Sequence, residues 1–290
     1  MITARRPLPP EYRRVIPAGP IFYKVNDVLD SGQLNTICVS GKCPNRGECF
    51  SRGSLAFMIL GDLCTRHCGF CAVQAGHPEG IVDWDEPKRL AQAVASLKLR
   101  HVIITSVARD DLEDGGASVF EACIQEVRRV SPSTIIEVLI PDFCADRAAL
   151  DTILNAEPEI FNHNIETVER LTPTVRSKAT YGRTLDVLQY AAGRRGPKIK
   201  SGFMLGLGEM RDEILQTLID LRSVGSEYLT IGQYLQPSAR HLAIQSYVPR
   251  EDFRHWEREA FRLGFERVAS GPLVRSSYFA DQLHSPESPS

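Results

Sequence analysis

The sequence lacks long apolar runs. No stretch approaches the roughly 18–20 consecutive apolar residues that cross a bilayer, so we expect no membrane span. It also lacks a strong excess of either charge, because 34 basic and 36 acidic residues leave a formal net charge of −2. That balance argues against a dedicated nucleic-acid binder. The first residues hold Arg5 and Arg6 and no apolar run, so we expect no secretory signal.

The size and composition are those of one folded domain. The 290 residues are 43% hydrophobic and 24% charged, enough to bury a substantial core. Apolar, strand-like runs alternate with segments of helical periodicity. We expect strands over 56–61, 102–105, 134–140, 160–164, 202–206 and 228–231. We expect helices near 22–32, 87–99, 118–130, 145–155, 181–192, 212–224 and 250–263.

This alternation gives six β-α units, which indicates an α/β fold with a parallel sheet. Six units are too few to close the usual eight-stranded barrel, so we expect an open, partial (β/α)6 barrel resembling a TIM barrel. The barrel would span 56–265, with an N-terminal extension at 1–55 and a C-terminal extension at 266–290, all in one compact domain. Functional residues should gather at the C-terminal ends of the strands.

Cysteine is concentrated in one part of the chain. Six of the eight cysteines form two triplets with different spacing. The first triplet is Cys38, Cys43 and Cys49, and the second is Cys64, Cys68 and Cys71. Thiols packed at such short spacing are either bonded as disulfides or bound to metal.

Three explanations compete for these triplets. Disulfide scaffolds are small secreted chains, which this one does not resemble, and we expect a cytoplasmic location. Zinc would need four ligands per site, and His67 or His77 could complete a shell. An iron–sulfur cubane needs four iron corners held by soft ligands, so three cysteines leave one iron open for a substrate or cofactor.

The second triplet carries a resemblance. In Cys64-Thr-Arg-His-Cys68-Gly-Phe-Cys71, an aromatic residue precedes the last cysteine, and the strand-like run at 56–61 precedes the first. This pattern resembles the radical S-adenosylmethionine superfamily. The resemblance implies a cubane on Cys64, Cys68 and Cys71 whose open iron binds S-adenosylmethionine. One-electron cleavage then yields a 5′-deoxyadenosyl radical, which takes hydrogen from an unactivated carbon.

The first triplet narrows the resemblance to the lipoyl synthase family. Its cysteines, together with Arg275-Ser-Ser-Tyr278, Phe161-Asn-His-Asn164 and Gly232-Gln-Tyr-Leu-Gln-Pro237, resemble that family from about residue 25 to residue 278. The family implies a second 4Fe–4S cluster on Cys38, Cys43 and Cys49. Its fourth ligand would be the hydroxyl of Ser277, with Ser276 as the alternative. A hard oxygen ligand dissociates from iron more readily than a thiolate.

The resemblance also implies a reaction. A sulfurtransferase of this family inserts two sulfur atoms, taken from the auxiliary cluster, at carbons 6 and 8 of an octanoyl-lysine. The substrates would be octanoylated carriers, namely lipoyl domains of dehydrogenase acyltransferase subunits and the glycine cleavage H protein. Ferredoxin or flavodoxin would supply electrons, and a repair protein would rebuild the cluster. The alternative is another sulfur-inserting radical enzyme, a methylthiotransferase or a protein like biotin synthase.

Several polar residues lie at or near expected strand ends. We expect them to contact S-adenosylmethionine or the octanoyl-lysine, although hydrogen-bonded loop positions explain them equally well. They are Ser106, Asp110, Asn162, Asn164 and Gln233. Glu137 lies inside a mostly apolar strand and would need a partner if it faces the barrel interior, so we expect it to contact the cofactor. We expect Arg176 to pair with the carboxylate of the cofactor.

Three further residues are expected to be structural. Cys123 and Cys144 lie outside both triplets and should be small buried apolar groups. His163 has no second histidine at metal-binding spacing.

Overall fold

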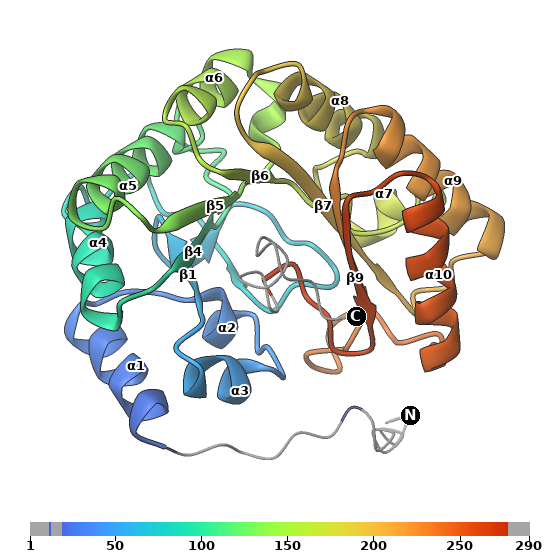
Figure 1. Cartoon of the computed structure of the whole chain (residues 1–290), viewed down its shortest axis with the longest axis horizontal. Helices are drawn as coiled ribbons and strands as arrows, with labels where there is room; N and C mark the ends of the chain where they lie inside the picture. The colour runs from blue at the N-terminus through green and yellow to red at the C-terminus, as the bar shows by residue number, and fades with distance from the viewer. Residues whose placement is uncertain (1–11, 13–18, 278–290) are drawn as a thin grey trace.

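The computed structural model describes residue 12 and residues 19–277, and its elements follow the expected alternation (Figure 1). The helices are α1 (Pro20–Ser31), α2 (Ile37–Ser40), α3 (Arg46–Ser51), α4 (Glu86–Leu97), α5 (Ala117–Val130), α6 (Arg147–Asn155), α7 (Thr172–Val175), α8 (Tyr181–Ala192), α9 (Arg211–Ser223) and α10 (Arg250–Arg262). The strands are β1 (Ala56–Ile59), β2 (Leu63–Cys64), β3 (Gln74–Ala75), β4 (His101–Ser106), β5 (Ile135–Leu139), β6 (Ile160–Asn162), β7 (Lys198–Leu205), β8 (Tyr228–Gln233) and β9 (Arg267–Gly271). Short 3-10 turns lie at Phe143–Ala145 and Glu169–Leu171.

Within the described residues, seven parallel strands form one curved sheet in the order β1-β4-β5-β6-β7-β8-β9. The larger helices pack outside it, as Figure 1 shows. β1 and β9 are the two edges of this sheet, so the barrel is open, as predicted. The six β-α units of the sequence are all present.

β9 is a seventh strand that the sequence analysis missed. It pairs with β8 from Tyr228↔Arg267 to Gly232↔Gly271. Its residues lie in the range that we assigned to a C-terminal extension. The sheet therefore continues past residue 265, while the division of the chain at 55 and 265 stays a prediction.

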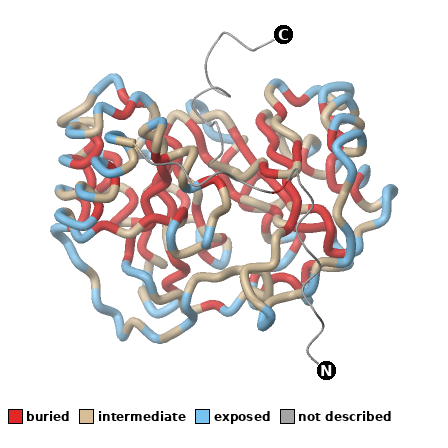
Figure 2. The backbone as a smooth tube through the Cα atoms, turned by 90° about the horizontal axis from the view of Figure 1, so that it is seen from below, coloured by how far each residue is buried: buried red, intermediate tan, exposed pale blue. Residues whose placement is uncertain are grey.

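The core lies between the sheet and the helices. One row of residues in register across four strands, Phe57, Ile104, Val138 and Phe161, is fully buried on the helix side. Each such side chain contributes about 1.5–3 kcal/mol by leaving water. Figure 2 shows the buried strands inside and the exposed surfaces outside. In the described part of the chain, no helix combines the length and apolarity that a membrane span requires.

Two segments distant in sequence meet at the open side of the barrel. The N-terminal segment is joined to β1, because Thr36 pairs with Phe57 and its hydroxyl donates to the Ala56 carbonyl at 2.6 Å. The C-terminal turn contacts the same segment, because Asn45 Nδ2 donates to the Leu273 carbonyl at 2.6 Å. The first cysteine triplet therefore lies next to the turn that carries Ser276 and Ser277.

Gly232 lets the C-terminal turn approach β8. A Cβ at this position would lie 2.1 Å from the carbonyl oxygen of Val274 and 3.2 Å from Nη1 of Arg275. Such a separation is too short for any side chain, so only glycine allows the turn to reach the strand.

We predict that Gly232→Ala lowers the free energy of unfolding by about 1–3 kcal/mol, because the strand or the turn must move. Urea denaturation measures the change. Gly182→Ala in α8 is the matched control, because a Cβ there meets nothing within 4 Å. Alanine in a helix is the better helix former by up to about 1 kcal/mol, so this control should be neutral or stabilising. Equal stability of the Gly232 variant and the wild type would contradict the close approach.

Candidate cluster and cofactor site

The second cysteine triplet lies on the loop after β1. The Sγ atom of Cys64 accepts hydrogen bonds from the backbone N–H groups of Arg66, at 3.4 Å, and Ala108, at 3.3 Å. Burial raises the pKa of Cys71 to about 12, and the thiols of Cys68 and Cys64 add to the shift. The three thiols thus share one loop at the C-terminal end of the first strand, where barrels of this kind place their functional residues.

The first triplet lies on two short helices that cover the open side of the barrel. Cys38 belongs to α2 and Cys49 to α3, with Cys43 between them. Burial, with a smaller contribution from Cys38 and Cys43, raises the pKa of Cys49 to about 12. Burial, followed by the nearby Cys43, also raises the pKa of Cys38. The three thiols are therefore close enough to repel one another when ionised.

The thiols of both triplets suit a cationic cluster better than they suit disulfide bonds. All eight cysteines are free thiols, which excludes a disulfide scaffold. Among the described residues, no three Cys, His, Asp or Glu side chains converge on a site for a single metal ion. Partly buried, mutually repelling thiols suit a larger group that brings its own positive charge.

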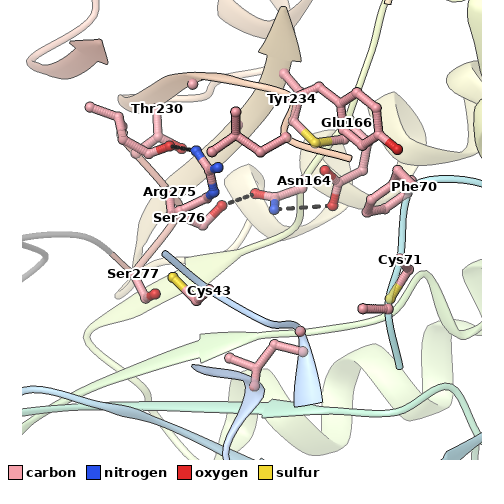
Figure 3. A pocket seen from close by; sticks show the side chains of 18 of the residues that line it. Cys43, Phe70, Cys71, Asn164, Glu166, Thr230, Tyr234, Arg275, Ser276 and Ser277 are labelled. Carbon is pink, nitrogen blue, oxygen red and sulfur yellow. Dashed lines mark hydrogen bonds between the residues drawn. The ribbon is translucent and has the colours of Figure 1, made fainter. Parts of the chain in front are cut away.

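One cavity of about 230 Å³ in the barrel joins the two triplets. Cys38 and Cys43 line it on one side and Cys71 on another. In Figure 3, Cys43 and Cys71 lie on opposite sides of the pocket. The rest of its wall is largely apolar and includes Leu139, Phe203, Met204, Tyr234 and Leu235. The cavity suits a ligand with an alkyl portion placed between two metal clusters.

The two serines of the C-terminal turn have different surroundings. Ser276 is engaged twice, because its Oγ donates to Asn164 Oδ1 at 2.9 Å and its carbonyl accepts from Lys200 Nζ at 2.7 Å. Ser277 lines the cavity, and Figure 3 shows its hydroxyl beside the thiol of Cys43. This arrangement favours Ser277 over Ser276 as a ligand to a cluster on the first triplet. Tyr278 lies outside the described residues.

Asn164 lines the cavity beside a carboxylate that the sequence analysis missed. Asn164 Nδ2 donates to Glu166 Oε1 at 3.1 Å, and both side chains face the pocket in Figure 3. Burial raises the pKa of Glu166, and Arg176 opposes that shift. Glu166 has a φ of 70° in the loop after β6, and no periodic pattern marks such a position. The predicted Arg176 lies behind this wall and donates to Thr184 Oγ1 at 2.7 Å.

Glu137 and Asn162 lie in the barrel interior outside the residues that line the cavity. Glu137 is fully buried and accepts from Lys200 Nζ and from Asn162 Nδ2, both at 2.8 Å. Burial raises the pKa of Glu137, but Lys200 and His101 outweigh it and hold the pKa at about 2. The carboxylate is therefore ionised and already paired, which is a structural explanation for its place in an apolar strand.

The remaining candidates also lie outside the lining of the cavity. The side chain of Gln233 is held by backbone at both ends: Nε2 donates to the Ser246 carbonyl and Oε1 accepts from Val248 N–H, each at 2.9 Å. The Oγ atom of Ser106 is buried with no partner in the structure. Asp110 pairs with Arg66 at 2.7 Å. Roles of these residues in cofactor binding stay predictions.

Of the three residues expected to be structural, two are as predicted. His163 is buried, with Nδ1 2.9 Å from the Ile140 carbonyl and Nε2 3.1 Å from Thr184 Oγ1, and burial lowers its pKa to about 4. Cys123 is completely buried. The prediction for Cys144 was wrong, because this thiol is exposed. It lies in the left-handed turn Phe143–Ala145 before α6, and its φ is 53°.

A segment after β8 holds the loop of the second triplet, and the sequence analysis missed it. His241 Nε2 lies 2.9 Å from the carbonyl oxygen of Cys71. The backbone N–H of Leu242 donates to the Gly69 carbonyl at 3.0 Å. A Cβ on Gly69 would lie 2.9 Å from Leu242 Cγ, so the glycine admits this contact.

Comparison of folds and sequences places these features in a family. Streptococcus suis SuiB bound to S-adenosylmethionine has a TM-score of 0.56 and 10% identity over 75% of this chain and 50% of its own. Methylornithine synthase (PylB) has a TM-score of 0.50 and 13% identity over 89% of this chain and 83% of its own. At such identities the likeness shows the fold alone.

Sequence relatives are far more similar. Residues 58–221 match the model of the Radical SAM superfamily. The mitochondrial lipoyl synthase of Nematostella vectensis is 47% identical over 278 residues, 96% of this chain and 95% of the relative. Lipoyl synthase of Thermus thermophilus is 49% identical over 271 residues, 92% and 84% of the two chains. The chain therefore belongs to the lipoyl synthase family of the radical S-adenosylmethionine superfamily.

Proposed function

We propose that the protein inserts two sulfur atoms, at carbons 6 and 8, into an octanoyl chain amide-linked to a lysine of a carrier protein. The observation that supports this most is the mainly apolar cavity with one cysteine triplet on each side. Relatives named lipoyl synthase match nearly the whole chain.

Family membership makes S-adenosylmethionine and iron–sulfur clusters the cofactors of this protein. Cys64, Cys68 and Cys71 would hold one 4Fe–4S cluster, and Cys38, Cys43, Cys49 and Ser277 the other. When bound, these groups supply a carbon radical that abstracts hydrogen and a sulfide that replaces it.

The residues of the cavity would position the substrate and exclude water. Phe203, Met204 and Leu139 offer an apolar wall to the octanoyl chain, which gains about 0.8 kcal/mol for each CH₂ group removed from water. The same wall keeps water and other hydrogen donors away from a reactive carbon. Asn164 and Glu166 are polar residues of the same cavity, and their oxygens would accept hydrogen bonds from the hydroxyl or ammonium groups of S-adenosylmethionine.

The partners and compartment belong to the same proposal. Octanoylated lipoyl domains and the glycine cleavage H protein would be the carriers, with ferredoxin or flavodoxin as reductant and a separate protein for cluster repair. We expect a cytoplasmic location, although one relative is named as mitochondrial.

The proposal predicts the product directly. Anaerobically reconstituted and reduced protein, incubated with S-adenosylmethionine and an octanoyl-lysine peptide, should add two sulfur atoms to the peptide, seen by mass spectrometry. A methylthiolated peptide, or cofactor cleavage without any sulfur added, would point to another radical enzyme of the superfamily.

The two clusters should be separable by substitution. Ser277→Ala should reduce sulfur insertion at least about tenfold more than it reduces 5′-deoxyadenosine formation, because it removes only the labile ligand of the auxiliary cluster. Cys68→Ala is the opposite control and should abolish 5′-deoxyadenosine formation. Both products are quantified in one reaction by liquid chromatography. An equal loss of both products in the Ser277 variant would reject the role of this serine.

A further inference from the structure

Lys200 of β7 reaches the C-terminal turn from inside the barrel. Its side chain is completely buried, and its Nζ donates to the carbonyl oxygen of Ser276 at 2.7 Å. The same ammonium pairs with Glu137 Oε1 at 2.8 Å. The ammonium of Lys200 therefore donates to the backbone of Ser276, the residue just before Ser277.

Burying the ion pair of Lys200 and Glu137 costs free energy, because both charges lose their hydration. Lys200 and Glu137 both leave water completely, and Glu137 also accepts from Asn162. Buried pairs add little net stability compared with apolar side chains of the same size, but they fix geometry closely. Besides the Glu137 carboxylate, the ammonium contacts the backbone oxygen of Ser276.

A second contact holds the same residue. Ser276 Oγ donates to Asn164 Oδ1 at 2.9 Å, in addition to the contact of its backbone carbonyl with Lys200. Figure 3 shows this bond, with the hydroxyl of Ser277 directed away from it toward Cys43. Two barrel residues therefore fix Ser276, and Ser277 is left facing the first triplet.

We propose that Lys200, assisted by Asn164, is a positioning residue that sets the hydroxyl of Ser277 against the auxiliary cluster through the backbone of Ser276. The inference rests on the proposed function, because it takes Ser277 as a ligand of that cluster. Lys200 itself touches neither substrate nor cluster in this account. A hydrogen bond from a charged group is the strongest kind available for holding a turn in place.

The test compares two variants. One removes the hydrogen bond from Lys200 to Ser276, and the other removes only the Glu137 carboxylate that pairs with Lys200. In Lys200→Met/Glu137→Gln, the barrel interior stays neutral while the bond to Ser276 is lost. The comparison variant Glu137→Gln keeps the Lys200 side chain that donates to Ser276 but removes the partner charge of Lys200. The measurements on anaerobically reconstituted protein are the Mössbauer spectrum, the iron content and the ratio of sulfur-inserted peptide to 5′-deoxyadenosine.

The double variant should show a changed auxiliary-cluster spectrum and a product ratio lowered about tenfold, as expected for the loss of one charged hydrogen bond. The control should keep the wild-type spectrum. A purely structural role would instead lower stability in both variants and leave the spectra alike. A wild-type spectrum and ratio in the folded double variant would overturn the proposal.

Two further outcomes bear on the role of Lys200 and on the proposed function. If circular dichroism shows that the double variant does not fold, Lys200→Gln/Glu137→Gln carries the test, because it also removes the charged hydrogen bond to Ser276 and leaves no buried charge. This variant should lower the same ratio, and an unchanged ratio would reject the inference. If the wild-type protein itself holds one cluster or inserts no sulfur, it is the proposed function that fails.

Discussion

Neighbouring, partly buried thiols resist ionising together unless a cation compensates them. In both triplets, burial and mutual repulsion raise thiol pKa values, as Cys49 and Cys71 show. Thiolate ligation therefore requires a group that carries positive charge into the site. This requirement links the sequence pattern to iron–sulfur chemistry, and the rest of the fold serves to hold two such groups near one cavity.

The open barrel provides the space for this arrangement. A closed barrel fills its interior with side chains, whereas here the sheet stops at β1 and β9 and leaves one side free. The segment with the first triplet and the C-terminal turn occupy that side and are tied together by the bond from Asn45 to Leu273. Substrate-sized space is thus enclosed between the strand ends and two segments that are far apart in sequence.

The main strands, the open barrel and the two cysteine triplets could be predicted from the sequence. Apolar runs identified six strands, and the cysteine spacing separated two triplets. β9 was missed because Val268 is the one large apolar residue in Arg267–Gly271, and the strand depends on pairing with β8. Glu166 was missed because a positive φ turns it into the cavity, and Cys144 was misjudged because its left-handed turn exposes the thiol. Such features depend on tertiary contacts rather than on periodicity.

Sulfur insertion by this protein requires two clusters in one chain, so its metal content is the most direct test. Iron and acid-labile sulfide should be measured in protein purified and reconstituted without oxygen. Two 4Fe–4S clusters predict about eight of each per chain. About four of each, or zinc in place of iron, would contradict the account.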